Sequence, residues 1–182
     1  TVKSLLLGMC FVLGACTSQT STVQTTEKGT QWEWQNGTIV VKTPERPAGQ
    51  KSVLGLTTPK LEAVRVGFVG LGMRGPGAVE RFTYIPGTQV VALCDYEEAR
   101  ADKCQELLKK ASMPKAAVYS GDKGYEELCK RDDIDLVYIA ADWLHHFPVA
   151  KCALENGKNV AIEVPSAINL HECWDLINLS ES

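Results

Sequence analysis

The sequence predicts an α/β protein built on a doubly wound parallel sheet with helices on both faces. From Val64 onward, short apolar runs alternate regularly with segments of helical periodicity. The runs are apolar almost throughout, as in parallel strands that helices cover on both sides. A glycine-rich turn directly follows the first run, which makes the expected fold Rossmann-type. Strands are expected at 64–69, 89–94, 116–119, 135–140 and 159–163, and helices at 75–84, 96–111, 123–131, 147–156 and 169–180.

The glycine turn reads Gly70-x-Gly72-x-x-Gly75, and Asp95 ends the second apolar run. A dinucleotide needs each glycine: Gly70 permits a tight turn, Gly72 lets the backbone approach a pyrophosphate, and Gly75 lets the helix pack close to the strand. Asp95 can accept hydrogen bonds from a ribose 2′-OH and would repel a 2′-phosphate. The pattern therefore predicts NAD in preference to NADP, with the pyrophosphate at the helix N-terminus.

Two further groups of residues follow later strands, at the same edge of the predicted sheet. The carboxyl ends of parallel strands share one edge, where open α/β sheets bind their ligands. The segment Asp142–His146 follows the strand at 135–140, and Glu163 lies at the end of the strand at 159–163. Their convergence with the glycine turn is stronger evidence for a ligand site than any one motif.

Two interpretations remain open for these groups. Trp143 can lie against the nicotinamide or ribose while a histidine contacts a cofactor hydroxyl; alternatively, Trp143 caps the sheet and His145 and His146 cap the next helix. Glu163 can be a ribose ligand or a helix-capping charge. Adjacent histidines point in different directions and make a poor metal pair, and His171 is expected on the surface.

The first 15 residues have the pattern of a bacterial lipoprotein signal peptide. Lys3 precedes an apolar stretch, Leu5–Leu13, and small residues lead to Cys16. In that class the chain is cleaved before the cysteine, whose thiol then carries lipid. The stretch is too short to span a bilayer core of ~30 Å as a helix, and a buried strand or helix is the alternative. We expect an exported bacterial lipoprotein anchored to a membrane through Cys16, at the periplasmic face or in the outer membrane.

Residues 16–62 are expected to form a flexible tether and an extended lead into the NAD-binding domain at 63–182. Within this segment, alternating residues around Asn36-Gly37 predict a small hairpin at 31–41. Its two tryptophans are expected to pack on the main domain rather than to form a platform for a sugar.

The composition is that of an ordinary soluble globular domain, with 45% hydrophobic and 23% charged residues. The net charge of −3 gives no reason to expect nucleic acid as a partner. The seven cysteines show no CxxC or Cys/His ligand spacing, so no metal site is predicted. The five cysteines that follow Cys16 are expected to be buried, reduced thiols.

Several motifs together resemble the N-terminal half of the Gfo/Idh/MocA oxidoreductase superfamily. They are Gly-Phe-Val-Gly-Leu-Gly at 67–72, Cys94-Asp95, Asp135-Leu-Val-Tyr-Ile-Ala140 and Glu163-x-Pro165. Most dehydrogenases of that group carry Glu-Lys-Pro at the last motif, where the lysine assists proton transfer, but this chain has Val164. Residues 64–75, 142–146 and 163–174 resemble instead glycoside hydrolase family 109.

This resemblance implies an NAD-dependent α-N-acetylgalactosaminidase, often an exported bacterial lipoprotein, with a glycan or sugar as substrate. It implies that recycled NAD takes a hydride from C3 of the sugar, that the glycosidic oxygen is eliminated and water added, and that the hydride returns. The family's second, α+β domain, absent from this chain, would supply the catalytic residues. No catalytic residue is therefore assigned here, and this chain alone is expected not to cleave a glycoside. The full-length protein is compatible with an oligomer.

The cofactor contacts predicted from the glycine motif or implied by the resemblance lie in four segments. They are Gly70, Gly72, Met73, Arg74, Gly75, Asp95, Trp143, Leu144, His145, His146, Glu163 and Val164. An NAD-dependent sugar dehydrogenase of the same superfamily is the alternative function, and a non-catalytic, lipid-tethered binding module is a third. Stoichiometric accumulation of NADH would favour the dehydrogenase, because the hydrolase regenerates its cofactor in every turnover.

Overall fold

The computed structural model describes residues 24–25 and 31–182, which fall into two compact units divided after Thr43. The predicted signal segment 1–15 and Cys16 lie outside the described residues. Across the part of the chain that is described, no helix is both long and apolar enough to cross a membrane.

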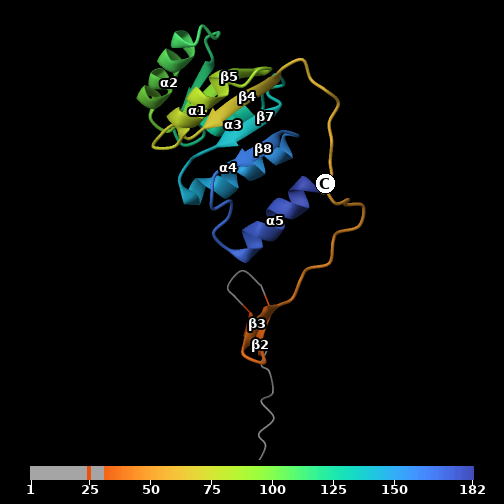
Figure 1. Ribbon diagram of the computed structural model, residues 1–182. Coiled ribbons are helices and arrows are strands. Elements are labelled where there is room, and N and C mark those ends of the chain that lie inside the picture. Colours follow the sequence, from red (N-terminus) through yellow and green to blue (C-terminus); the bar gives the residue numbers. More distant parts are fainter. Residues whose placement is uncertain (1–23, 26–30) are drawn as a thin grey trace, which may run out of the picture. The chain divides into compact units, whose positions relative to one another are not determined.

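The larger unit, Pro44–Ser182, is built on a five-stranded sheet in which every strand pair is parallel (Figure 1). Its strands are β4 (Val64–Val69), β5 (Thr88–Asp95), β6 (Ala117–Ser120), β7 (Leu136–Ile139) and β8 (Asn159–Ile162). Their order in the sheet is β6-β5-β4-β7-β8, so the chain winds outward from β4 first in one direction and then in the other. The carboxyl ends of β4 and β7 therefore frame the crevice in which such sheets bind ligands.

Helices cover both faces of this sheet. They are α1 (Gly75–Thr83), α2 (Glu98–Lys110), α3 (Gly124–Cys129), α4 (Trp143–Glu155) and α5 (Leu170–Ser180). Helices α1 and α2 share one buried core with Val66, Phe68 and Leu93. Helices α3 and α4 share a second core with Val137 and Ile139, and α5 packs against α4. The predicted doubly wound, Rossmann-type sheet with helices on both faces is confirmed.

The start of α4 is where the sequence-based boundaries were wrong. The helix expected at 147–156 begins at Trp143, whereas the bounds of the other elements of this unit agree within two residues. Pro148, which would lie in the first turn of a helix that begins at residue 147, lies inside the observed helix. The side chain of Asp142 instead caps an earlier start, since its Oδ1 accepts a hydrogen bond from the N–H of Leu144 at 2.9 Å. The segment 143–146 is therefore the first turn of α4.

The smaller unit contains a three-stranded antiparallel sheet. Its strands are β1 (Gln24–Thr25), β2 (Gln31–Gln35) and β3 (Thr38–Val41). The predicted hairpin at 31–41 is confirmed, because Asn36 and Gly37 have φ values of 51° and 78°, as a type I′ turn requires. Strand β1 was not predicted. The rings of Trp32 and Trp34 meet edge to face with centroids 6.4 Å apart, an arrangement that differs from a flat sugar platform.

The described cysteines are free thiols that differ in burial. Cys94, Cys104 and Cys129 are buried, Cys152 is half-buried and Cys173 is exposed. Burial, with a smaller effect of Asp95, raises the pKa of Cys94 to about 12 and that of Cys104 to about 11, so both thiols stay protonated. The expectation of buried thiols is therefore wrong for Cys173, which lies on the exposed side of α5, a helix that packs only along one face.

An ion pair joins the start of β4 to the start of its neighbour β7, at the amino edge of the sheet. The carboxylate of Asp135 accepts hydrogen bonds from the N–H, Nε and Nη2 of Arg65, at 2.8, 2.9 and 2.6 Å. The hydrogen bond from the Arg65 side chain is the main reason why the pKa of Asp135 is lowered, against partial desolvation. The pair fixes the start of β4 beside the start of β7, at the opposite edge from the glycine turn.

Replacing Asp135 by Asn should lower the free energy of unfolding by about 1 kcal/mol at neutral pH, because the charge-assisted contacts are lost. Since the folded-state pKa of Asp135 is lowered, its contribution is present above the unfolded-state pKa of about 3.9 and is lost as the pH falls through the folded-state value. Urea unfolding of wild type and Asp135→Asn should therefore converge in acid. Asp102→Asn, on the exposed surface of α2, is the control and should match wild type throughout. A difference that persists or grows in acid would contradict this account.

Candidate functional site

The glycine turn at the carboxyl edge is shaped by direct contact between β4 and the end of β7. Gly70 has a φ of +90°, and a Cβ atom there would lie 2.3 Å from the N atom of Ala141. A Cβ atom on Gly75 would lie 2.2 Å from the carbonyl O of Gly70. No side chain fits at either position, so both glycines are required for the turn to close against β7 and α1.

The turn leaves several backbone N–H groups open. Among the described residues, the N–H groups of Gly72, Met73 and Arg74 donate to no protein acceptor. Helix α1 has no side-chain cap at Arg74 and no acidic residue in its first turn. Apart from its chain neighbours, the nearest described atom to a Cβ on Gly72 would be Nη1 of Arg100, at 3.6 Å, so the backbone there is open to a close approach. Open N–H groups at the positive end of a helix dipole are suited to an anion such as a pyrophosphate.

Asp95 holds the turn in place. The residue is buried, with 5% of its surface exposed, and its Oδ2 accepts a hydrogen bond from the N–H of Leu71 at 2.6 Å. Its Oδ1 accepts a hydrogen bond from the N–H of Glu97 at 2.9 Å. Asp95 was predicted only as a ribose ligand; the structure adds that its carboxylate joins the glycine turn to the end of β5.

Two charged residues near Asp95 were missed in the sequence analysis. Nη1 of Arg100 lies 3.4 Å from Oδ1 of Asp95, and Nη2 lies 2.9 Å from Oε1 of Glu97. Glu97 and Arg100 are three residues apart at the start of α2, a spacing that places their side chains together. The signal in the sequence was the acidic residue two positions after Asp95, followed by an arginine one helical turn later.

The first turn of α4 presents Trp143 and Leu144 to solvent at the same edge. Trp143 is 64% exposed and Leu144 is 70% exposed. Nδ1 of His145 lies 2.6 Å from Oδ2 of Asp142, which is also the helix cap. Partial burial opposes ionisation of Asp142, but the hydrogen bonds from His145 and from the N–H of Leu144 lower its pKa. His145 therefore reinforces the cap of α4, while the side chain of Trp143 is mostly exposed to solvent.

His146 points the other way, into the protein. It is buried, and its Nδ1 lies 2.7 Å from the carbonyl O of Pro165. Because a carbonyl only accepts, Nδ1 carries a proton, and Nε2 is buried without a partner among the described residues. His146 thus ties α4 to the loop after β8, and the two histidines diverge as expected.

Glu163 and Val164 lie on that loop. Oε1 of Glu163 accepts a hydrogen bond from the hydroxyl of Tyr138 at 2.8 Å. Partial burial, followed by the bond to Glu163, raises the pKa of Tyr138, so the hydroxyl remains a donor. The helix-capping interpretation of Glu163 is wrong, since Asn169 caps α5 by accepting from the N–H of Glu172 at 3.0 Å. Val164 is 83% exposed beside it.

The carboxyl edge therefore brings together all the segments that sequence reasoning selected. The side chains of Met73, Trp143, Leu144 and Val164, which all lie in segments at this edge, are apolar and exposed, and the glycine turn leads into a helix without a side-chain cap. A flat, partly apolar ligand with a central anion fits this combination better than a small ion does. Whether each predicted residue contacts a cofactor stays a prediction.

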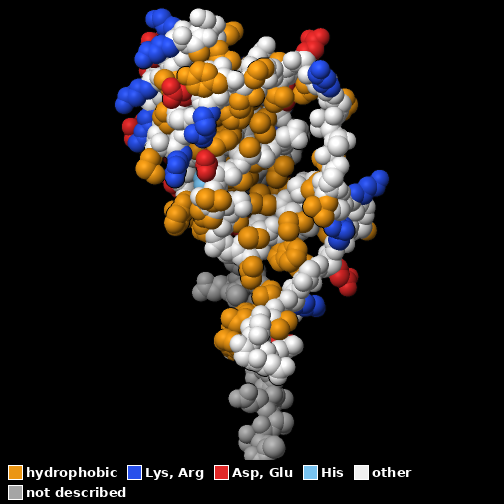
Figure 2. Space-filling model, viewed as in Figure 1, with side chains coloured by type: hydrophobic (Ala, Val, Ile, Leu, Met, Phe, Trp, Pro, Cys, Tyr) orange, Lys and Arg blue, Asp and Glu red, His pale blue; other side chains and the backbone are white. Residues whose placement is uncertain are grey.

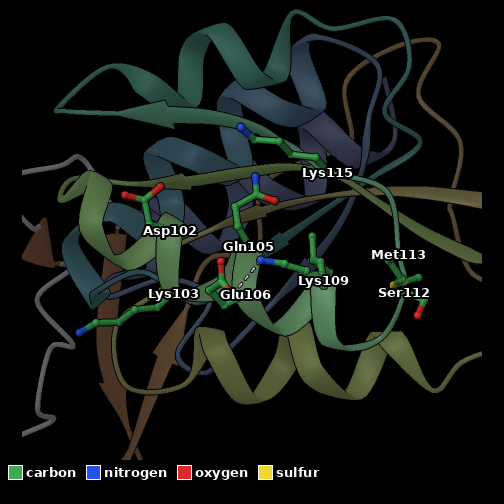
Figure 3. Close-up of a pocket in the computed structure, with 9 residues that line it drawn as sticks. Asp102, Lys103, Gln105, Glu106, Lys109, Ser112, Met113 and Lys115 are labelled. Atoms are coloured by element: carbon green, nitrogen blue, oxygen red, sulfur yellow. Dashed lines mark ion pairs between the residues drawn. The ribbon is translucent and has the colours of Figure 1, made fainter.

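A separate groove of about 730 Å³ runs along α2, and none of the residues of the glycine turn lines it (Figure 3). Its lining comes from α2 and the segment after it, and includes Lys103, Lys109 and Lys115. Figure 3 shows Lys109 paired with Glu106, at 3.9 Å. Figure 2 shows Lys and Arg side chains gathered over α2, so this groove belongs to a charged, solvated helix face. No group of three or more His, Cys, Asp and Glu residues in the described ranges is arranged to hold a metal ion.

Comparison with protein families matches residues 64–182 to the family described as "Oxidoreductase family, NAD-binding Rossmann fold", GFO_IDH_MocA. The chain is 79% identical over 182 residues to glycosyl hydrolase family 109 protein 4 of Phocaeicola vulgatus, covering 100% of this chain and 35% of that protein. It is 56% identical over 181 residues to glycosyl hydrolase family 109 protein 1 of Bacteroides thetaiotaomicron, covering 99% of this chain and 38% of that protein. The chain spans about a third of the length of these curated relatives.

Solved structures share the fold. Myo-inositol dehydrogenase from Lactobacillus casei, in complex with NAD(H) and myo-inositol, has a TM-score of 0.56 at 25% identity, over 64% of this chain and 33% of that one. The 3-ketoreductase KijD10 from Actinomadura kijaniata, in complex with TDP-benzene and NADP, has a TM-score of 0.56 at 26% identity, over 65% and 35%. The chain therefore belongs to the Gfo/Idh/MocA oxidoreductase family, whose NAD-binding Rossmann fold it contains, and along its whole length it is similar to glycosyl hydrolase family 109 proteins.

Proposed function

We propose that this chain is the NAD-binding part of an exported glycosidase that removes terminal α-linked N-acetylgalactosamine by redox-assisted elimination and addition. The observation that carries the proposal is the open glycine turn at the switch point of the sheet, in a chain 79% identical to a glycosyl hydrolase family 109 protein. Relatives of that name point to glycoside cleavage, and the Rossmann fold points to NAD.

In this proposal the residues of the chain bind and orient NAD. The N–H groups of Gly72, Met73 and Arg74 would hold the pyrophosphate, and the guanidinium of Arg74 would add charge-assisted hydrogen bonds. Asp95 keeps the turn in shape through Leu71 and lies where the adenosine ribose is expected. These residues fit the pyrophosphate of NAD for two reasons. The glycine turn offers N–H donors without a protein partner, and the first turn of α1 has no acidic side chain that would repel the anion.

Bound NAD would supply a reversible hydride acceptor, which is the chemistry that a redox-assisted glycosidase requires. Trp143, Leu144 and Val164 would shield the nicotinamide side of the site from water. Val164 cannot transfer a proton, whereas the lysine typical of this position in related dehydrogenases can. This difference supports a glycosidase over a simple sugar dehydrogenase, because residue 164 cannot act as an acid or base in the reaction.

A sugar dehydrogenase of the same family remains the second candidate. The observation that favours it is the structural similarity to myo-inositol dehydrogenase, whose structure contains NAD(H) and myo-inositol. The two functions differ in what happens to the cofactor. A dehydrogenase consumes NAD with its substrate, whereas the proposed glycosidase returns the hydride in each cycle.

Replacing Gly72 by Ala should weaken NAD binding without destabilising the fold. A Cβ atom at Gly72 would lie 3.6 Å from Nη1 of Arg100, an ordinary contact, yet it would occupy the space that the pyrophosphate must approach. We expect NAD affinity to fall by about tenfold or more, or at least 1.4 kcal/mol, measured by isothermal titration calorimetry.

Gly77→Ala is a matched control for this change, because a Cβ atom there also meets a single arginine Nη1, that of Arg81, at 3.6 Å. It should leave NAD affinity close to wild type and should raise the melting temperature slightly, since alanine favours the helix by up to about 1 kcal/mol. If Gly72→Ala and Gly77→Ala bound NAD with equal affinity, the proposal that the pyrophosphate binds at this turn would be wrong.

Full-length protein should release N-acetylgalactosamine from a chromogenic α-linked substrate over many turnovers while absorbance at the NADH band stays flat. NADH that accumulates in step with an oxidised sugar would establish the dehydrogenase instead. The 182-residue chain alone should bind NAD but release no sugar, because the residues at its carboxyl edge are proposed to hold the cofactor and none is proposed to act on the sugar.

We also propose that the protein is anchored to a membrane through lipid on Cys16. Expressed in a bacterial host with lipoprotein processing, the full-length protein should sediment with membranes and incorporate a labelled fatty acid. Cys16→Ala should abolish the label and shift the protein to the soluble fraction, whereas Cys10→Ala should do neither. An unlabelled wild-type protein would refute the anchor.

A further inference from the structure

The end of β5 carries a three-residue cluster in which one guanidinium is shared by two carboxylates. Arg100 contacts Asp95 at 3.4 Å and Glu97 at 2.9 Å. Asp95 is buried, whereas the side chains of Glu97 and Arg100 are 57% and 42% exposed. Two carboxylates against one guanidinium leave the cluster with a net negative charge.

The cluster lies directly beside the glycine turn. Among the described residues other than Gly72 and its two chain neighbours, only Arg100 has an atom within 4 Å of the position of a Cβ on Gly72, namely Nη1 at 3.6 Å. Asp95 in turn accepts from the N–H of Leu71, at 2.6 Å. With a pyrophosphate on the open N–H groups of the turn, the adenosine ribose lies toward the end of the second strand, where this cluster is found.

We infer that Glu97 and Arg100 determine the selectivity of this site between NAD and NADP, with Glu97 holding Arg100 in a state that cannot receive a 2′-phosphate. This inference rests on the proposed binding of NAD at the glycine turn. In NADP-dependent proteins, an arginine near the end of the second strand of the fold accommodates the 2′-phosphate. Its planar guanidinium can donate two parallel hydrogen bonds to one phosphate. Here Nη2 of Arg100 already donates a hydrogen bond to Glu97, and the net negative charge of the three-residue cluster repels a phosphate.

Removing the charge of Glu97 should therefore expose a latent 2′-phosphate site. In Glu97→Gln the contact of Arg100 with Asp95 remains, but that contact is long, at 3.4 Å, and the guanidinium can turn toward the ligand. The affinity for NADP should rise about tenfold. The affinity for NAD should fall by no more than about threefold, because Asp95 keeps its bonds to the N–H groups of Leu71 and Glu97.

The test is calorimetric titration of NAD and of NADP into full-length protein from which bound cofactor has been removed. Glu98→Gln is the matched control, since it removes the same charge from the neighbouring residue, whose side chain is not paired with Arg100. It should leave the ratio of NADP to NAD affinity within about twofold of wild type, because an exposed charge at a distance is largely screened. The double variant Glu97→Gln/Arg100→Ala should lose the gain for NADP.

Three outcomes separate the hypotheses. A gain for NADP in Glu97→Gln alone, lost in the double variant, supports the inference. NAD binding that persists without any gain for NADP, or an equal gain in Glu98→Gln, overturns the inference and leaves the proposed function intact. Wild-type protein that binds neither dinucleotide overturns the proposed function itself.

Discussion

The hydrogen bond between the carboxylate of Asp95 and the N–H of Leu71 is the interaction on which the rest of the site depends. It joins the turn after β4 to the end of β5, two segments separated by 24 residues in the chain. Asp95 holds the turn from one side and Ala141 contacts it from the other, while the N–H groups of Gly72, Met73 and Arg74 have no acceptor among the described residues. The buried carboxylate of Asp95 thus helps to form an anion site. It fixes the conformation of the turn, and in that conformation some of the backbone N–H groups have no acceptor in the protein.

Much of this arrangement could be predicted from the sequence, since it depends on local chemistry. Strands such as β4 are nearly continuous apolar runs, and the glycines at 70 and 75 stand where any Cβ atom would collide with backbone. These constraints act over a few residues and leave a clear pattern. The same holds for the hairpin at Asn36-Gly37, where the turn type dictates the residues.

Features that depend on contacts between distant segments could not be predicted in this way. The bond from Tyr138 to Glu163 joins β7 to the end of β8, and the bond from His146 to Pro165 spans 19 residues. The start of α4 was misplaced because Asp142 caps the helix before Trp143, so that Pro148 lies inside the helix and not at its start. The cap prevailed since its carboxylate binds both Leu144 and His145.

The contact of Gly70 with Ala141 has a consequence for how the protein reaches its native state. The anion site exists only after β4, β5 and β7 have come together, so the unfolded chain offers nothing equivalent to a dinucleotide. Cofactor uptake and completion of the sheet are consequently linked equilibria: a dinucleotide at a hundred times its dissociation constant would add about 2.7 kcal/mol to the native state. In a cell the cofactor supply would thereby help to determine how long the protein survives proteolysis.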